Sequence, residues 1–191
     1  MIERLFHNLN DWRHLPAYQL ERRADIFFSL YLKDVVENFL QLELEDLIIP
    51  EFPLKSPDSN KSTKVDYALF AKDRSSVIFI ELKTDKRSTR KEQVDYLFQA
   101  QKDRFQKILT GFKAIFAATN EFEKYFHLAK KMEDLGFLEL PEKLQEKIFA
   151  TSPRHGLREL IGSMEVCRDD PAIKVLVHPQ NLWINNRLKE F

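Results

Sequence analysis

Apolar residues recur along this chain with two periods, which predict where its helices and strands lie. Between residues 19 and 43 they return every three or four positions, the spacing of an amphipathic helix packed on a sheet. Residues 64–72 and 77–84 are rich in β-branched and aromatic side chains, as strands are, and LIIPEF at 47–52 is a third such run. The helical stripe comprises Leu20, Ala24, Phe27, Phe28, Tyr31, Leu32, Val35, Phe39 and Leu42.

The two longer strand-like runs are separated by a short polar segment, KDRS, which predicts a β-hairpin. A two-residue turn at Asp73 and Arg74 would set the register so that Asp66 lies opposite Glu81. Because side chains alternate along a strand, Lys83 falls on the same face. Two acids and a lysine are therefore expected to meet at one end of the hairpin.

Two carboxylates at neighbouring strand positions repel each other unless a cation lies between them. A divalent metal resolves the conflict between Asp66 and Glu81. Two carboxylates, a backbone carbonyl such as that of Leu82, and several waters form the oxygen set that Mg²⁺ accepts, with positions left for a substrate phosphate. Lys83 would position or help to deprotonate an attacking water and offset the charge that builds on the phosphorane.

Asp66 on one strand and Glu81-Leu82-Lys83 at the end of the next resemble the motif of the PD-(D/E)XK nuclease superfamily. Its members carry an acid on one strand and an acid-any-lysine triplet on the next. The resemblance covers roughly residues 19–119, and this is the only acid-any-lysine triplet in the sequence.

The sequence departs from the family's name at one position, because Val65 rather than a proline precedes Asp66. A literal Pro57-Asp58 lies in the turn-like stretch SPDSN, where Asp is favoured for backbone reasons, and we set it aside. The resemblance thus assigns the first acid to the strand rather than to the turn.

The resemblance implies a three-layer α/β/α fold with a central mixed sheet of four to five strands, the restriction-endonuclease-like order α-β-β-β-α-β. A helix beginning near Thr89 would end at Gly111. FKAIFAAT at 112–119 would then be a strand parallel to 77–84, reached through that helix.

Two further residues, Glu21 and Gln93, are candidates for assisting roles at the metal site. Glu21 projects onto the apolar stripe of the first helix, whereas Glu37 points away from it. Several nucleases of the superfamily, Holliday-junction resolvases among them, have a first-helix glutamate near the metal, so Glu21 would be a further ligand; the alternative is that it pairs with a nearby arginine or lies at the rim. Gln93 is similar to the glutamine of the RecB-like branch and would hold a carboxylate or a phosphate; the alternative is a solvated or core-satisfied side chain.

Residues 83–91 carry five basic side chains and one acid, so their local net charge is +4 in a chain whose 30 Lys and Arg balance 30 Asp and Glu. A basic patch beside a metal site is what binding of a phosphate backbone needs. Ser88 or Thr89 would cap the next helix, whose amino-terminal amides also favour phosphate. Beyond the lysine of the triplet, the basic residues are Lys86, Arg87, Arg90 and Lys91.

Composition indicates that residues 1–191 form a single domain. Its nuclease-like core would span about 19–119, and helices and a strand would follow at 120–191. A single cysteine, Cys167, permits no internal disulfide, and no signal peptide or membrane-spanning run is evident, so a cytoplasmic protein without a membrane partner is expected. P-loop, GxGxxG, paired-cysteine and Ser-His motifs are absent from the sequence. The C-terminal elements are a helix from Asn120 as its cap to about Leu135, a short helix at 141–149 and a strand at 172–179.

The sequence thus predicts a nuclease dependent on Mg²⁺ or Mn²⁺. Asp66 and Glu81 would hold the metal, Lys83 would serve the attacking water, and Glu21 and Gln93 would assist. Nucleic acid, DNA before RNA, is the expected partner, and a homodimer is one arrangement that would cut both strands.

Two alternatives to the nuclease stay open. In the first, the fold is a non-catalytic module that docks DNA or a partner protein through the basic patch. In the second, Asp66, Glu81, Lys64 and Lys83 form only an ion-pair cluster at a strand end, and such surface clusters contribute little to stability.

Overall fold

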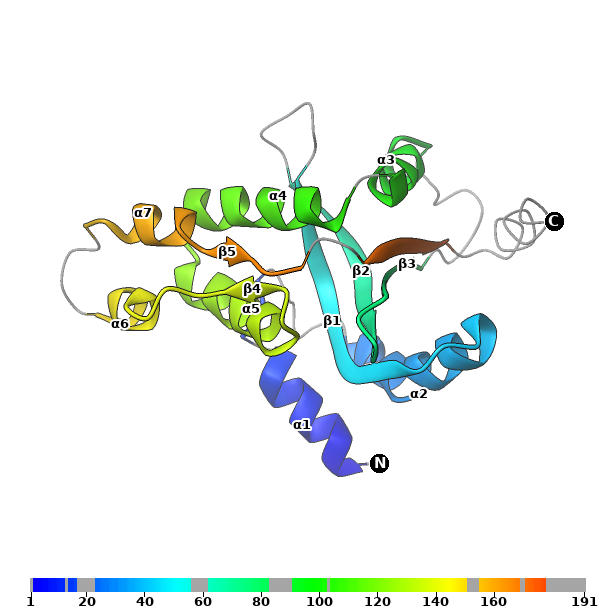
Figure 1. Cartoon of the computed structure of the whole chain (residues 1–191). Helices are drawn as coiled ribbons and strands as arrows, with labels where there is room; N and C mark the ends of the chain where they lie inside the picture. Colours follow the sequence, from blue (N-terminus) through cyan, green and yellow to red (C-terminus); the bar gives the residue numbers. More distant parts are fainter. Residues whose placement is uncertain are drawn as a thin grey trace.

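The computed structural model describes residues 2–12, 14–16, 23–55, 62–82, 91–102, 104–150, 155–168 and 171–177. Within these ranges the chain is a mixed α/β protein (Figure 1). The helices are α1 (Ile2–Trp12), α2 (Arg23–Leu40), α3 (Lys91–Lys102), α4 (Phe105–Ala118), α5 (Phe122–Asp134), α6 (Leu144–Phe149) and α7 (Leu157–Gly162). The strands are β1 (Leu44–Lys55), β2 (Ser62–Ala71), β3 (Ser76–Glu81), β4 (Leu138–Glu139), β5 (Glu165–Val166) and β6 (Ala172–Val177).

The main sheet has four strands in the order β1-β2-β3-β6. β1 pairs antiparallel with β2, and β2 pairs antiparallel with β3, whereas β3 and β6 are parallel. β4 and β5 form a separate two-stranded sheet. The predicted mixed sheet within an α/β protein is therefore confirmed.

The register of the β2–β3 hairpin is the predicted one. Phe70 lies opposite Val77, and Ala68 lies opposite Phe79. The pairing is set by the alternation of side chains and by the connection between the strands. This register determines which residues of the two strands are neighbours at the open end of the hairpin.

The turn of the hairpin is one position earlier than predicted. The amide of Arg74 donates to the carbonyl oxygen of Ala71 at 3.0 Å, which makes Lys72 and Asp73 the central residues of a β-turn. Arg74 adopts a positive φ of 64°, and the amide of Ser75 donates to Oδ1 of Asp73 at 2.9 Å. The side-chain hydrogen bond stabilises a longer connection that keeps the same register.

The prediction of a strand at 112–119 was wrong, because residues 112–118 belong to α4 and Thr119 is its C-cap. The buried residues of α4 are Phe105, Ile108, Leu109, Phe112 and Phe116, and their spacing is helical throughout.

The prediction that Gly111 ends a helix was wrong, because this residue lies within α4. A Cβ atom at this position would lie 3.0 Å from Cβ of Lys55, so the missing side chain lets α4 approach β1 closely. The glycine therefore allows close packing of the helix on the strand. The prediction had instead followed the common occurrence of glycine at helix ends.

The parallel neighbour of β3 comes from the C-terminal part of the chain. The strand expected at 172–179 is present as β6, and its residues pair with β3 from Ser76–Ala172 to Glu81–Val177. The elements of the main sheet keep the expected order α-β-β-β-α-β, as α2, β1, β2, β3, α3 and β6. The difference from the prediction is that α4, α5, β4, α6, α7 and β5 are inserted between α3 and β6 in the sequence.

The first predicted helix is present as α2, but part of its predicted buried face is wrong. Tyr31 and Val35 are each 55% exposed, while Val36 is buried. Glu37 does not point away from the fold, because its carboxylate accepts a hydrogen bond from the amide of Leu44 at 2.8 Å. This contact links the end of α2 to the start of β1.

The helices expected after residue 120 and within 141–149 are present as α5 and α6. The cap of α5 is Glu121 rather than the predicted Asn120. The hydroxyl of Thr119 accepts a hydrogen bond from the amide of Glu121 at 3.0 Å, so the threonine stabilises the turn that leads into the helix.

Both faces of the central sheet are covered. All six residues of β3 are buried, although their side chains alternate between the two faces. α2 packs near the start of β1, α4 packs near its end and α3 packs against β6, while α5, α6 and α7 gather on the other side of the molecule from β6 (Figure 1). The buried apolar residues of these elements form one hydrophobic core.

Candidate metal-binding site

Asp66 and Glu81 lie at one end of the β2–β3 hairpin. Tyr67 pairs with Ile80, and the next residue toward the open end is Asp66 on β2 and Glu81 on β3. Glu81 is also the last residue of β3 and pairs with Val177 on β6. The backbone at Glu81 is thus held in position by β2 on one side of β3 and by β6 on the other.

Asp66 holds the backbone just beyond Glu81. Its Oδ2 atom accepts a hydrogen bond from the amide of Leu82 at 2.6 Å. The short distance is typical of a charge-assisted hydrogen bond. The carboxylate of Asp66 accepts from a backbone amide that would otherwise donate to a carbonyl oxygen of a neighbouring strand. Asp66 is half-buried, so its carboxylate is held in place near the surface.

Glu81 is an unusual side chain for its position. It is 2% exposed, and among the described residues it is the only charged residue in the buried class, which otherwise contains two serines and apolar side chains. Removing a carboxylate from water is unfavourable unless neighbouring groups or a cation compensate for its charge. A buried acid at the end of this strand therefore needs compensating groups around its carboxylate.

Glu51 on β1 is a further acid next to Asp66, and no role was predicted for it. Its two neighbours on β1 pair with the two neighbours of Asp66 on β2, so Glu51 lies across from Asp66. Its Oε2 atom lies 3.7 Å from Nζ of Lys64, which is two residues before Asp66. The sequence contained one indication of a role for Glu51, which is an acid within the apolar run LIIPEF. Its position across from Asp66 could not be predicted, because the register of β1 on β2 does not follow from that run.

Lys64 was one member of the ion-pair cluster considered as an alternative. The ion pair that it forms is with Glu51 rather than with Asp66 or Glu81. Lys83, another member of that cluster, lies outside the described residues, so the ion-pair alternative stays open.

Several of the predicted site residues lie outside the described part of the chain. These are Glu21, Lys83, Lys86, Arg87 and Arg90. Gln93 and Lys91 lie in the first turn of α3, which follows the basic segment, but their side chains are not among those described. Their roles stay predictions.

The donors at the hairpin end suit a hard cation. Two carboxylates and the nearby carbonyl of Leu82 are all oxygen donors, which Mg²⁺ and Mn²⁺ prefer. Within the described ranges no group of three or more His, Cys, Asp or Glu could hold a metal. A site at Asp66 and Glu81 would accordingly rely on backbone and water oxygens for its remaining ligands, as Mg²⁺ sites do.

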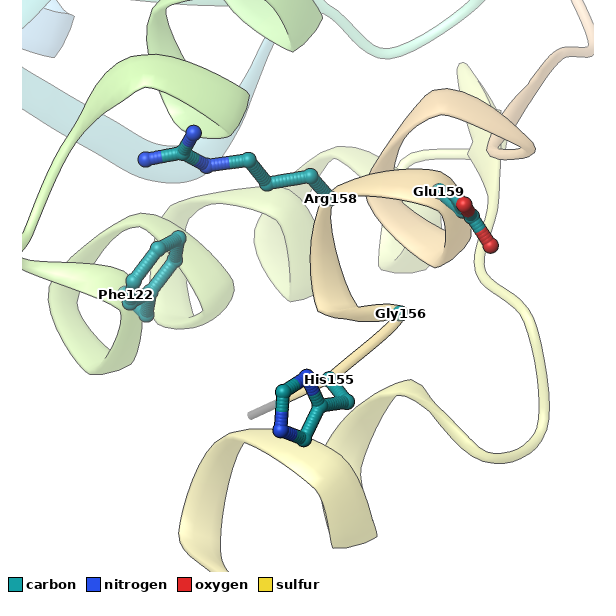
Figure 2. Close-up of a pocket in the computed structure, with 5 residues that line it drawn as sticks. All are labelled: Phe122, His155, Gly156, Arg158 and Glu159. Carbon is teal, nitrogen blue, oxygen red and sulfur yellow. The ribbon is translucent and has the colours of Figure 1, made fainter. Parts of the chain in front are cut away.

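Two surface hollows lie elsewhere. One, of about 430 Å³, is formed by α5, α7 and the residues before α7, and is lined by Phe122, His155, Gly156, Arg158 and Glu159 (Figure 2). The other, of about 440 Å³, lies between α1, β1 and α5. Neither is lined by Asp66 or Glu81, and neither carries a pair of neighbouring acids on adjacent strands.

None of the helices in the described ranges has the length and hydropathy needed to cross a bilayer. Comparisons with protein-family models, curated proteins and solved structures gave no match to this chain.

Proposed function

We propose that this protein is a metal-dependent nuclease that hydrolyses phosphodiester bonds of nucleic acid, with DNA as its substrate, on a three-layer restriction-endonuclease-like fold. The observation that carries the proposal is the placement of a buried acid, Glu81, one step beyond the last antiparallel pair and next to Asp66. Acids with no chemical task are rarely kept at such positions.

The proposal rests first on charge. Two carboxylates on adjacent strands are unfavourable beside each other, and burial of one of them adds to that cost. A divalent cation would offset both terms at once. The oxygen-only donor set then selects Mg²⁺ or Mn²⁺ over softer metals.

The carboxylates of Asp66 and Glu81 and the carbonyl of Leu82 would hold the metal, which when bound supplies a Lewis acid and lowers the pKa of a coordinated water. The hydrogen bond from the amide of Leu82 keeps Asp66 in one orientation. Burial keeps Glu81 in another. Such prior orientation removes the need to reorganise the site during the reaction.

Lys83 follows Leu82 directly in the sequence. In the proposed reaction its ammonium group orients the attacking water and compensates the negative charge that develops on the phosphoryl oxygens. Lys86, Arg87, Arg90 and Lys91 would contact the phosphates that flank the cleaved bond, because basic side chains in the same segment favour a polyanion. Glu21 and Gln93 would assist the metal and its ligands.

Metal binding and cleavage can be tested on the same variants. Titration calorimetry with Mn²⁺ should give a binding signal for the wild type that Asp66→Asn and Glu81→Gln lose. Nicking of supercoiled plasmid in Mg²⁺ should fall by at least about a hundredfold in both, since a lost ligand removes several kcal/mol of transition-state stabilisation.

The matched control is Asp73→Asn, which changes an exposed acid in the turn at the opposite end of the same hairpin. It should bind Mn²⁺ and nick DNA like the wild type. Wild-type nicking by Asp66→Asn or Glu81→Gln would overturn the proposal. Nucleic-acid binding without any Mn²⁺ signal or cleavage would favour the non-catalytic module instead.

A further inference from the structure

A lysine and an acid that lie beside the proposed metal site have no role in it so far. Lys64 precedes Asp66 by two residues on β2, so both side chains project from the same face of the sheet. Two residues along a strand span roughly 7 Å. The Cα atom of Lys64 is therefore displaced along β2 from that of Asp66 by about this distance.

Glu51 fixes the position of this lysine. Its carboxylate lies 3.7 Å from the ammonium group, and its side chain is only 15% exposed, against 37% for that of Lys64. A mostly buried acid restricts the lysine more than an exposed one would, because its own freedom is small. The lysine keeps part of its surface open to solvent and to an incoming anion.

The backbone at Glu51 is strained. Its φ is +52°, a left-handed conformation that is unfavourable for a residue with a side chain, and it lies within β1. Residues in such conformations persist where the surrounding structure imposes them, and they cluster at functional sites. The residue with this conformation is the acid of β1 that lies across from Asp66 and forms the ion pair with Lys64.

We infer that Lys64 is a second phosphate-binding residue of the site, positioned by Glu51, and that it contacts a backbone phosphate next to the one that is cleaved. This inference rests on the proposed nuclease function. The ammonium group of Lys64 has no lone pair with which to bind a metal, but the side chain lies on the same face as Asp66 and is 37% exposed, so it is open to an anion. The substrate class that it selects is a nucleic-acid strand with at least two consecutive phosphates, rather than a phosphomonoester.

The chain contains a matched control for this ion pair. Lys72, which directly follows β2, and Glu43, which directly precedes β1, form a second Lys–Glu contact at 3.4 Å near the turn of the hairpin. Lys72 is 54% exposed and lies at the opposite end of β2 from Lys64. Lys72→Gln therefore removes the same charge from the protein without touching the proposed site.

The experiment measures binding of short fluorescent DNA oligonucleotides, single- and double-stranded, to the full chain in Ca²⁺, which supports binding without cleavage. Lys64→Gln should raise Kd about three- to tenfold and lower the slope of log Kd against log salt concentration by about 1, whereas Lys72→Gln should match the wild type. Glu51→Gln should raise Kd less than Lys64→Gln does. The double variant Glu51→Gln with Lys64→Gln should be no weaker than Lys64→Gln alone, because Glu51 acts through the lysine.

Cleavage in Mg²⁺ gives the second readout. Lys64→Gln should raise KM and leave kcat within about twofold, because the lost contact is equally strong in the ground state and in the transition state. Lys64→Arg should restore most of the binding. A merely structural ion pair would change the melting temperature and leave the salt dependence of binding unaltered.

The outcomes separate the two proposals. Wild-type affinity and salt dependence in Lys64→Gln, or equal weakening in Lys72→Gln, would overturn the role of Lys64 while cleavage by the wild type leaves the nuclease standing. Selective weakening in Lys64→Gln together with no cleavage in Mg²⁺ or Mn²⁺ would support the phosphate contact and reject the nuclease. Failure of the wild type to bind any oligonucleotide would overturn both.

Discussion

Oδ2 of Asp66 accepts a hydrogen bond from the amide of Leu82 at 2.6 Å, so a side chain of β2 holds the backbone of the neighbouring strand just after its last residue. The contact gives Asp66 a structural task besides the proposed binding of a metal. These two tasks can be separated by substitution, because asparagine keeps an oxygen acceptor and alanine does not.

Asp66→Ala should lower the free energy of unfolding by about 1–3 kcal/mol, because the half-buried amide of Leu82 loses its acceptor. Asp66→Asn should lower it by less than about 1 kcal/mol. Urea denaturation in EDTA measures both without any contribution from a metal. Equal losses in the two variants would show that the hydrogen bond contributes little, and that the carboxylate charge is what matters for stability.

Mn²⁺ should stabilise the wild type and leave Glu81→Gln unchanged. A ligand that binds only the native state at a hundred times its Kd adds about 2.7 kcal/mol, which for a chain of this size corresponds to roughly 5–10 °C in melting temperature. Thermal denaturation with and without Mn²⁺ measures the shift. The same rise in the glutamine variant would mean that the ion binds elsewhere.

Gly111→Ala should destabilise the fold by about 1 kcal/mol. The added Cβ would lie 3.0 Å from Cβ of Lys55, an atom fixed to the backbone of β1, and overpacking of this kind costs about 1–3 kcal/mol. The better helix propensity of alanine returns up to about 1 kcal/mol.

Gly162→Ala is the control for that prediction, since an added Cβ at Gly162 meets nothing within 4 Å. It should be neutral or stabilising by up to about 1 kcal/mol, because only the propensity contributes. Chemical denaturation of the two variants side by side makes the comparison. A stabilised Gly111→Ala would show that α4 can move away from β1 without loss.

The contact of α1 with α5 should depend on pH through Asp11. Oδ1 of Asp11 lies 2.9 Å from Nε2 of His127, and Oδ2 accepts from Nζ of Lys131 at 2.6 Å. Burial raises the pKa of Asp11, but the hydrogen bonds and charges of His127 and Lys131 outweigh it and lower the pKa from 3.8 to about 2. A pKa that is lowered by folding contributes stability above about pH 4, and that contribution is lost as the pH falls toward 2.

Asp11→Asn should therefore be less stable than the wild type at neutral pH, by on the order of 1 kcal/mol because the group is partly exposed. The difference should shrink between about pH 4 and pH 2. Urea denaturation at a series of pH values follows it. Asp134→Asn, which changes an exposed acid on α5, serves as the control and should show no such trend; a constant difference for Asp11→Asn would reject the linkage.

Local patterns in the sequence were sufficient for the hairpin. Its two apolar strands are joined by a short polar connection, so the pairing of Phe70 with Val77 followed from neighbouring residues alone. The same reasoning placed Asp66 and Glu81 next to each other. The exact turn differed because Asp73 stabilises it through its own side chain, which a count of residues does not include.

Contacts between distant segments were not predictable in this way. FKAIFAAT has the composition of a strand, but Phe112 and Phe116 continue a helical spacing that starts at Phe105. Gly111 resembled a helix end because the close approach of Lys55 is invisible in the sequence. Glu51 was missed for a related reason, since its place across from Asp66 depends on the register of β1.

The parallel pairing of β6 with β3 affects how the chain is made. A ribosome-bound chain that has not yet emitted residues 172–177 would carry β3 with one edge open, and open strand edges pair readily with other chains. The carboxylate-bearing end of β3 would also lack one of its two flanking backbones. β3 therefore becomes an inner strand of the sheet, with Glu81 flanked on both sides, only after residues 172–177 have been made and have paired with it.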